Sequence, residues 1–571
     1  MTTITKHKKL MILLLFALLI YTIKNIFVGA DVDEGYGMVL GWRLVNGDRL
    51  FLDMWEPHQT SGIFTALFMK LILWLRGGNM DYLNLLLRVA FFLVQGLIAY
   101  LVCRVFAACL LDDDQQEYAV YFAFIYYLTT PKCIFIPEYS NLQVWFFTLA
   151  ALGFIRYYRS RDTSSPYRII WLVFAGFMLA CDVLAYPSML LLFPPCLILI
   201  GKCHIRSPLA EFIAFILPCL LGAGVFIAYI FSYMSFDELR YVLPHILTDG
   251  SHDISLSESI LTALASFGMI LLMIAGISAV AFLILTVYRK NSKKALTEKG
   301  SFAVFLLLWF LVQTIMQFYY WFAGNYNSGY PQISYLALMF FGIILYFVQY
   351  SSKKAGFLLI LFSFLSYAAL ILLSNWEPIH LSVYLVMGLL GGLLFVGKFL
   401  KDSLPSGNRW FSIILAVFIL SNVFGRCYLM IGGEEVHSTI FNVRGINRQG
   451  VRAGIFTSYM NAYRYNTTLP DWQEIAPDGS TVLYVGPSQH LYMLSNTTIA
   501  APSTISTPTY DESLLSYWEL NPERYPDVVA VESWFGDIPL YGEDSFIMQW
   551  LENEFQASEI IDYSYVRVYR K

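Results

Sequence analysis

Charged side chains are scarce in this sequence. Asp, Glu, Lys and Arg make up 14% of its 571 residues, whereas 57% are hydrophobic and the mean hydropathy is +0.58. Soluble domains carry about 25% charged residues, so the composition excludes an ordinary soluble protein and predicts a polytopic membrane protein. The formal net charge is −4, so there is no basic excess of the kind that nucleic-acid binding requires.

Cysteine is also uncommon, and it is absent after Cys427. The chain has eight cysteines, and none has the short spacing that is typical of zinc sites. We expect them to pack as small apolar residues. A domain that follows Cys427 therefore folds without disulfides.

Long hydrophobic runs, by contrast, fill residues 1–432. They have about the length that spans a bilayer, and the first follows Lys6, Lys8 and Lys9 as an uncleaved helix with a cytoplasmic N-terminus. The thirteen predicted spans are 10–28, 81–109, 117–136, 141–157, 168–186, 187–201, 209–234, 257–288, 301–322, 332–350, 355–373, 379–398 and 409–431.

The distribution of Lys and Arg supports this count. Basic clusters recur on the side of the N-terminus, whereas the opposite loops near 236–256, 323–331 and 374–380 contain Arg240 as their one Lys or Arg. Cytoplasmic loops carry the excess of Lys and Arg. We therefore expect the first loop and the C-terminal part to be extracytoplasmic.

The composition changes at Gly433. Residues 433–571 contain eight Lys and Arg but eighteen Asp and Glu, and short apolar runs replace the long ones. This length suffices for one small α/β domain. The expected strands are Thr481–Val485, Thr498–Ala501, Asp527–Val531 and Tyr563–Val568, and the expected helices are Ser488–Leu494, Asp511–Glu519 and Asp544–Phe555.

The loop at 29–62 concentrates the ionisable residues of the membrane part. It holds six acids, two arginines and a histidine, and helical apolar spacing at Glu34–Val45 and Ile63–Leu75 predicts two helices along the outer interface. Membrane proteins usually keep such groups for chemistry or transport. The simpler alternative is a solvated helix start, because acids favour the first turn.

At these residues the sequence resembles the GT-C superfamily of membrane glycosyltransferases, whose nearest branches are the protein O-mannosyltransferases and the lipid A aminoarabinose transferases. The matching motifs are Asp33-Glu34-Gly35-Tyr36, Gly47-Asp48, Asp53 and Glu56-Pro57-His58, followed by Arg88. Two positions depart from the pattern: Tyr186-Pro187 stands where relatives often have Lys-Pro, and Ser334-Tyr335 where many have His-Tyr.

The resemblance implies transfer of a sugar from a polyprenyl-phosphate carrier to an extracytoplasmic hydroxyl, usually with inversion. It places the protein in the inner or plasma membrane of a bacterium. It implies Asp33 as general base with Glu34 in support, because a carboxylate must take the acceptor proton. Cations must hold the departing phosphate, and the candidates are Arg88, Lys132, Arg240 and His58.

Each of these cations also has a structural explanation. Arg88 can reach to the interface as a snorkelling residue, Lys132 can be solvated, and Arg240 can pair with neighbouring acids. The remaining candidates for substrate binding are Asp53, Glu56, Glu138, Asn141 and Tyr335. Glu138 and Asn141 either bind sugar hydroxyls or cap the following helix.

We expect no metal cofactor. If a divalent cation were bound, the acids Asp31, Asp33 and Glu34 would be its ligands, although such a site needs more ligands than this spacing guarantees. The donor is a lipid-linked sugar, and the acceptor is a glycan, lipid or protein.

Three other functions compete with the glycosyltransferase. A polysaccharide polymerase or O-antigen ligase uses similar donors but relies on a large late outer loop with arginines, and 236–256 is short. A lipid-linked sugar transporter would place ionisable groups at mid-membrane, whereas here they gather in outer loops. A non-enzymatic receptor would tolerate substitution of the loop acids.

Overall fold

The computed structural model describes residues 8–30, 32–131, 134–160, 167–203, 207–247, 256–291, 297–322, 330–372, 381–430, 438–505, 508–532, 534–535, 538–539 and 545–571. The predicted candidates Asp31 and Lys132 lie outside these ranges.

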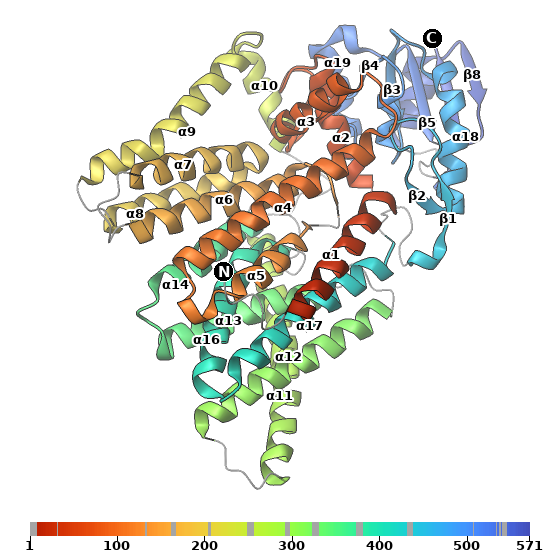
Figure 1. The fold of residues 1–571 in the computed structure, drawn as a ribbon. Helices are drawn as coiled ribbons and strands as arrows, with labels where there is room; N and C mark the ends of the chain where they lie inside the picture. Colours follow the sequence, from red (N-terminus) through yellow and green to blue (C-terminus); the bar gives the residue numbers. More distant parts are fainter. Residues whose placement is uncertain are drawn as a thin grey trace.

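In the described part of the chain, the named elements as far as Tyr428 are all helices (Figure 1). They are α1 (Lys8–Phe27), α2 (Val32–Val45), α3 (Gly62–Leu75), α4 (Leu83–Cys109), α5 (Tyr118–Tyr127), α6 (Tyr139–Arg159), α7 (Arg168–Ala185), α8 (Phe193–Cys203), α9 (Pro208–Ile230), α10 (Phe236–Leu247), α11 (Leu256–Asn291), α12 (Glu298–Phe322), α13 (Tyr330–Gln349), α14 (Lys354–Leu372), α16 (Val386–Ser403) and α17 (Gly407–Tyr428).

The helices pack closely where glycine lets two backbones approach. α13 lies against α16, and a Cβ placed on Gly342 would come within 2.4 Å of the Gly392 Cα. α7 lies between α6 and α9, and a Cβ on Gly176 would lie 2.1 Å from the Phe215 carbonyl oxygen. Small residues at helix crossings are typical of membrane bundles, in which close van der Waals packing drives association.

Nine helices of the described residues are long and apolar enough to cross a membrane, and the chain is an integral membrane protein. The predicted number of thirteen spans is not confirmed. The predicted span 117–136 is a helix only to Tyr127, because Gln95 Nε2 binds the carbonyls of Tyr126 and Thr129 where the helix ends. The predicted span 187–201 begins as a 3₁₀ helix, Pro187–Leu192, before α8.

A mixed sheet follows the last membrane helix, as predicted. Its strands lie in the order β4-β3-β5-β9-β8, in which β3 is parallel to β4 and β5, and β9 is antiparallel to β5 and β8. These strands are β3 (Thr481–Val485), β4 (Thr498–Ile499), β5 (Val528–Glu532), β8 (Glu559–Asp562) and β9 (Val566–Arg570).

The other elements of this region surround the sheet. They are β1 (Val443–Ile446), β2 (Phe456–Ser458), β6 (Trp534–Phe535), β7 (Ile538–Pro539), α18 (Tyr459–Ile475), η9 (Gln489–Met493), α19 (Pro508–Leu520), α20 (Phe546–Trp550) and a π-helical turn at Leu551–Phe555. The strand β5 is buried along its whole length, and the apolar side chains of the sheet belong to one core cluster with those of the helices.

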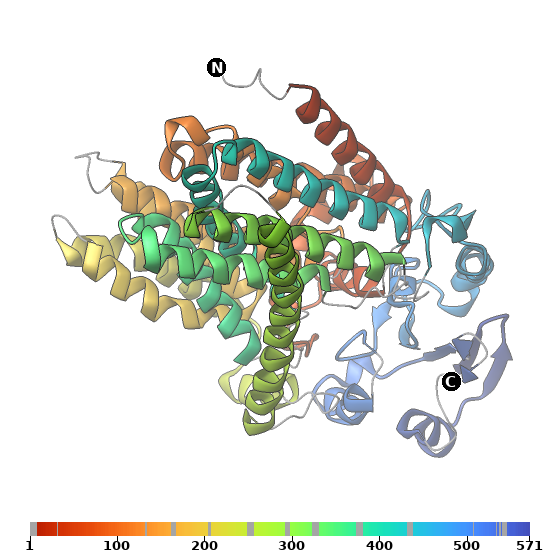
Figure 2. The same cartoon turned by 90° about the horizontal axis from the view of Figure 1, so that it is seen from below.

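The two predicted helices of the opening loop are present as α2 and α3. They lie on the side of the helical part that carries the sheet (Figure 1), and α2 packs on η9. Seen from below, the blue C-terminal elements gather at one side of the membrane helices (Figure 2). The charged loop therefore lies between the membrane helices and the C-terminal region.

Candidate functional site

The first turn of α2 places its two acids in different environments. Asp33 is partly exposed, whereas Glu34 is completely buried. Consecutive helical residues point about 100° apart, so the two carboxylates cannot share one direction. Both acids favour the positive end of the helix dipole.

Glu34 is bound by donors from three segments. Arg88 of α4 donates from Nε to Oε1 over 3.0 Å and from Nη2 to Oε2 over 2.5 Å. The amide of Phe135 also donates to Oε1, and the Asn84 side chain donates to Oε2. These four contacts match the roughly four acceptor positions of a carboxylate. Within the described residues, Glu34 therefore has no acceptor position left for a substrate or a metal ion.

Arg88, like Glu34, makes several hydrogen bonds. Its guanidinium also donates to the carbonyls of Asn25, Ile26 and Gly29, at 2.7 to 3.2 Å. The side chain is fully buried rather than reaching to the interface. The predicted site residues Glu34 and Arg88 are thus brought together, in a pair that fixes the end of α1 and the start of α2 on α4.

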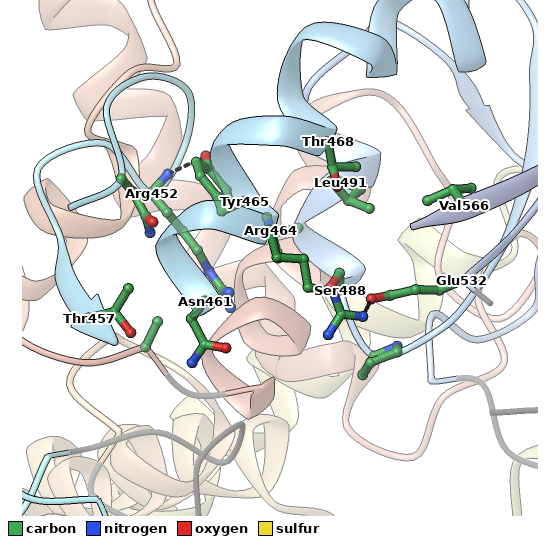
Figure 3. Close-up of a pocket in the computed structure, with 14 residues that line it drawn as sticks. Arg452, Thr457, Asn461, Arg464, Tyr465, Thr468, Ser488, Leu491, Glu532 and Val566 are labelled. Carbon is green, nitrogen blue, oxygen red and sulfur yellow. Dashed lines mark hydrogen bonds and ion pairs between the residues drawn. The ribbon is translucent and has the colours of Figure 1, made fainter. Parts of the chain in front are cut away.

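A small cavity lies between the start of the opening loop and the C-terminal region (Figure 3). Ala30 lines it on the loop side, and its volume of about 30 Å³ is enough for about two water molecules. Its charged and polar walls come from the C-terminal region: Arg452, Asn461, Arg464, Ser488, His490 and Glu532. We call this the interface cavity.

The guanidinium of Arg452 reaches from the wall of the interface cavity to α2. The side chain is buried, and a Cβ on Gly35 would lie 3.3 Å from its Nη2. Its guanidinium therefore lies against the turn that carries Asp33. Arg464 pairs instead with Glu532 (Figure 3). Glu532 also accepts a hydrogen bond from the Tyr484 hydroxyl.

His490 is a buried histidine in the wall of this cavity. It stacks on Tyr465 with ring centroids 5.4 Å apart, and its Nδ1 has no hydrogen-bond partner in the described part of the chain. Burial lowers the pKa of His490 well below its usual value, and the charges of Arg452 and Arg464 lower it further. The imidazole is therefore neutral at physiological pH.

The second half of the loop is bound to the C-terminal region through charge pairs. Asp53 binds Arg49 at 2.8 Å and lies 3.3 Å from Arg524, which also binds Asp48 at 2.9 Å. Burial raises the pKa of Asp53, but the hydrogen bond from Arg49 and the charge of Arg524 outweigh it, so the net shift is downward. Asp53 is therefore ionised and engaged within the protein.

Glu56 belongs to the same network through the fully buried Arg43. Its Oε1 lies 3.7 Å from Arg43 Nη1 and accepts the amide of Thr504 over 3.1 Å. Arg43 also binds the carbonyls of Ala501 and Pro502. Burial raises the pKa of Glu56. Neither Asp53 nor Glu56 is among the described residues that line the interface cavity.

The predicted residues on the membrane side of the loop form a separate group. His58 stacks on Tyr139 with ring centroids 4.0 Å apart. Glu138 caps α6, accepting the amides of Ser140 and Asn141 at 3.0 Å. The Asn141 side chain donates to the carbonyls of residues 134 and 136. Of the two alternatives for Glu138, its contacts are therefore those of a helix cap.

Tyr335 and Arg240 lie apart from this group. The Tyr335 hydroxyl is 3.1 Å from Thr129 Oγ1, and Arg426 at the end of α17 binds the adjacent Thr130. Arg240 is exposed on α10. Of the described residues, no group of three or more His, Cys, Asp or Glu has the arrangement of a metal site.

The sequence analysis did not select Arg452, Arg464, His490 or Arg426. A signal was available for the first of these. The segment Arg444–Arg452, RGINRQGVR, places three arginines at intervals of four residues within an otherwise acidic C-terminal region. No such sequence signal marks Arg464, His490 or Arg426, which only their tertiary contacts identify.

No protein-family model matches this chain, and no curated protein matches it in sequence. Solved structures that are similar include the archaeal oligosaccharyltransferase AglB from Archaeoglobus fulgidus, in complex with an inhibitory peptide and a dolichol-phosphate. That match is 11% identical, covers 92% of this chain and 70% of AglB, and has a TM-score of 0.43.

ArnT from Cupriavidus metallidurans, solved in the apo state, is also similar. It is 11% identical, the match covers 99% of this chain and 98% of ArnT, and the TM-score is 0.39. At these identities and TM-scores, neither match assigns an activity or a substrate to this chain.

Proposed function

We propose that this protein is a membrane glycosyltransferase that moves a sugar from a polyprenyl-phosphate donor to a hydroxyl of an extracytoplasmic acceptor. The observation that carries the proposal is the contrast between the two acids in the first turn of α2. Glu34 is fully engaged by Arg88, Asn84 and a backbone amide, while its neighbour Asp33 is partly exposed. Glu34 is then a positioning residue, and Asp33 is the general base.

The proposed step needs little acid catalysis, because a lipid phosphate is a good leaving group. The acceptor oxygen forms a bond to the anomeric carbon as its proton passes to the Asp33 carboxylate. The bond between the anomeric carbon and the phosphate oxygen breaks, and its electron pair leaves with the phosphate. A base of this kind contributes about 10²- to 10⁴-fold, and attack opposite the leaving group inverts the anomeric centre.

An apolar groove supports a lipid-linked donor. It has a volume of about 480 Å³ and lies between α1, α12 and α17, with Ile20, Phe318 and Phe424 in its walls. Its lining includes Cys427, the residue after Arg426, which binds Thr130. A polyprenyl chain in this groove would bring its phosphate toward Arg426 and the outer ends of the membrane helices.

We further propose that the C-terminal region, residues 433–571, is a domain that faces the periplasm or exterior. The clusters of Lys and Arg at the helix ends on the other side of the membrane part support this orientation through the positive-inside rule. Because the chain has no cysteine after Cys427, a Ser558→Cys variant supplies one exposed thiol in that region. A membrane-impermeant maleimide should label it in intact cells, and labelling only after lysis would place the domain in the cytoplasm.

The decisive test of activity is transfer from radiolabelled polyprenyl-phosphate sugars by the purified protein. We expect Asp33→Asn to lower the rate about 100-fold or more, because the amide cannot accept the proton. Asp237→Asn, which changes an exposed acid of α10, is the matched control and should retain the wild-type rate. Full activity in Asp33→Asn would contradict the assignment of the base.

A further inference from the structure

A second hollow lies at the opposite ends of the membrane helices from the opening loop. It has a volume of about 410 Å³ and is formed by the end of α4, the end of α6, the start of α14 and the last turns of α16. Four basic side chains line it, Arg159, Lys353, Lys354 and Lys398, and one acid, Asp112. We call it the basic pocket.

The single acid satisfies only two of the four cations. Asp112 binds Lys353 at 2.7 Å and Lys398 at 2.9 Å. In the described part of the chain, no acid within ion-pair distance is found for Arg159 or Lys354. The pocket lining therefore carries a net positive charge in a hollow that protein carboxylates do not fill.

The positive-inside rule by itself accounts for basic residues at these helix ends. It does not account for their convergence on one hollow from segments that lie far apart in the chain. Arg159 ends α6, Lys354 begins α14, and Lys398 is in α16. By contrast, Arg289 and Lys290 at the end of α11 are on the same side of the membrane part but do not line the basic pocket.

The walls of the basic pocket are amphipathic. Leu110, Leu111, Leu394 and Phe395 supply apolar surface beside the basic side chains. A volume of about 410 Å³ has room for a phosphate-containing headgroup. Basic pockets between membrane helices on the cytoplasmic side are suited to anionic lipid headgroups, since each nearby Lys or Arg adds about 1 kcal/mol.

We propose that the basic pocket binds the phosphate of an anionic glycerophospholipid headgroup. Arg159 and Lys354 contact the phosphate, and Lys353 and Lys398, held by Asp112, set the pocket's width. Free inorganic phosphate has the same charged group, but it lacks the acyl chains that would anchor a lipid between the helix ends. This site is independent of the sugar-transfer activity.

The test is native mass spectrometry of the purified full-length protein titrated with phosphatidylglycerol. We expect wild type to bind phosphatidylglycerol more tightly than phosphatidylcholine. Arg159→Gln with Lys354→Gln should weaken binding about 25-fold, because each lost charge costs about fivefold. Both side chains are exposed and unpaired in the described structure, so the variant should remain folded.

Two matched variants complete the experiment. Arg289→Gln with Lys290→Gln removes the same charge outside the pocket and should bind phosphatidylglycerol as wild type does. Arg159→Lys with Lys354→Arg keeps the charge and should retain binding. Equal binding of the two lipids, equal losses in the two Gln variants, or displacement by an equal concentration of inorganic phosphate would each overturn the proposal.

Discussion

Arg88 and Glu34 form an ion pair in which neither side chain is exposed to solvent, with 2.5 Å between Nη2 and Oε2. The pair joins α2 to α4, and the same guanidinium binds three carbonyls at the end of α1. The contacts of Arg88 therefore fix the chain on both sides of Asp33, although Asp33 is not part of the ion pair.

Glu34→Gln should destabilise the protein by roughly 3–5 kcal/mol, because it leaves the buried charge of Arg88 without compensation. Thermal unfolding in detergent measures the effect. The control is Glu298→Gln, which changes an exposed acid in the first turn of α12 and should stay within about 0.5 kcal/mol of wild type. Unchanged stability of Glu34→Gln would show that the pair does not hold α2.

Arg524→Gln should loosen the opening loop. Arg524 binds Asp48 and faces Asp53, and a hydrogen bond to a charged group contributes about 1.5–3 kcal/mol. Amide hydrogen exchange in residues 46–57 should be roughly 10- to 150-fold faster in this variant. Arg567→Gln removes an exposed pair with Asp562 and should leave exchange in the loop unchanged.

The neutral state of His490 predicts how stability depends on pH. Its pKa is lowered in the folded protein, so below about pH 6.5 the unfolded chain binds a proton that the folded protein does not. The free energy of unfolding then falls as the pH falls, by up to about 1.4 kcal/mol per pH unit. His490→Asn should flatten the thermal-unfolding profile between pH 7 and 5. Equal slopes in the variant and wild type would contradict the prediction.

Gly392→Ala should disrupt the crossing of α13 and α16. A Cβ at this position would lie 2.2 Å from the carbonyl oxygen of Leu338, and overpacking of this kind costs typically 1–3 kcal/mol. Gly222→Ala in α9 is the matched control, since no atom lies within 4 Å of its added Cβ. It should keep or raise the melting temperature, because Ala favours helix more than Gly. Equal effects of the two substitutions would contradict this prediction.

Most membrane helices could be predicted from long hydrophobic runs, and the two helices of the opening loop from helical apolar spacing. The strand Thr481–Val485 was predicted with the bounds that the structure gives it, because it is a continuous apolar run with β-branched residues. The helix α18 was not predicted, since polar side chains fill much of its length and Pro470 lies inside it. The strand β8, Glu559–Asp562, lies at the edge of the sheet and is mostly exposed. It was missed because it lacks the continuous apolar run of a buried strand.

The candidate site was less predictable than the fold. The acids of α2 could be selected because ionisable residues are rare beside membrane helices. Their partners could not, since Glu34 meets Arg88 across 54 residues and Arg43 meets Pro502 across 459. Such pairings depend on tertiary packing, which local sequence patterns do not encode. The functional roles of Asp33 and the other site residues stay predictions.

The contact between Arg43 and Pro502 also has a consequence for biosynthesis. At 5–20 residues per second, the ribosome needs roughly 20–90 s to make the residues that separate them. The loop is therefore made long before the part of the chain that completes it. Truncation before Pro502 would leave Arg43 without this support, and such fragments would be early substrates for proteolysis.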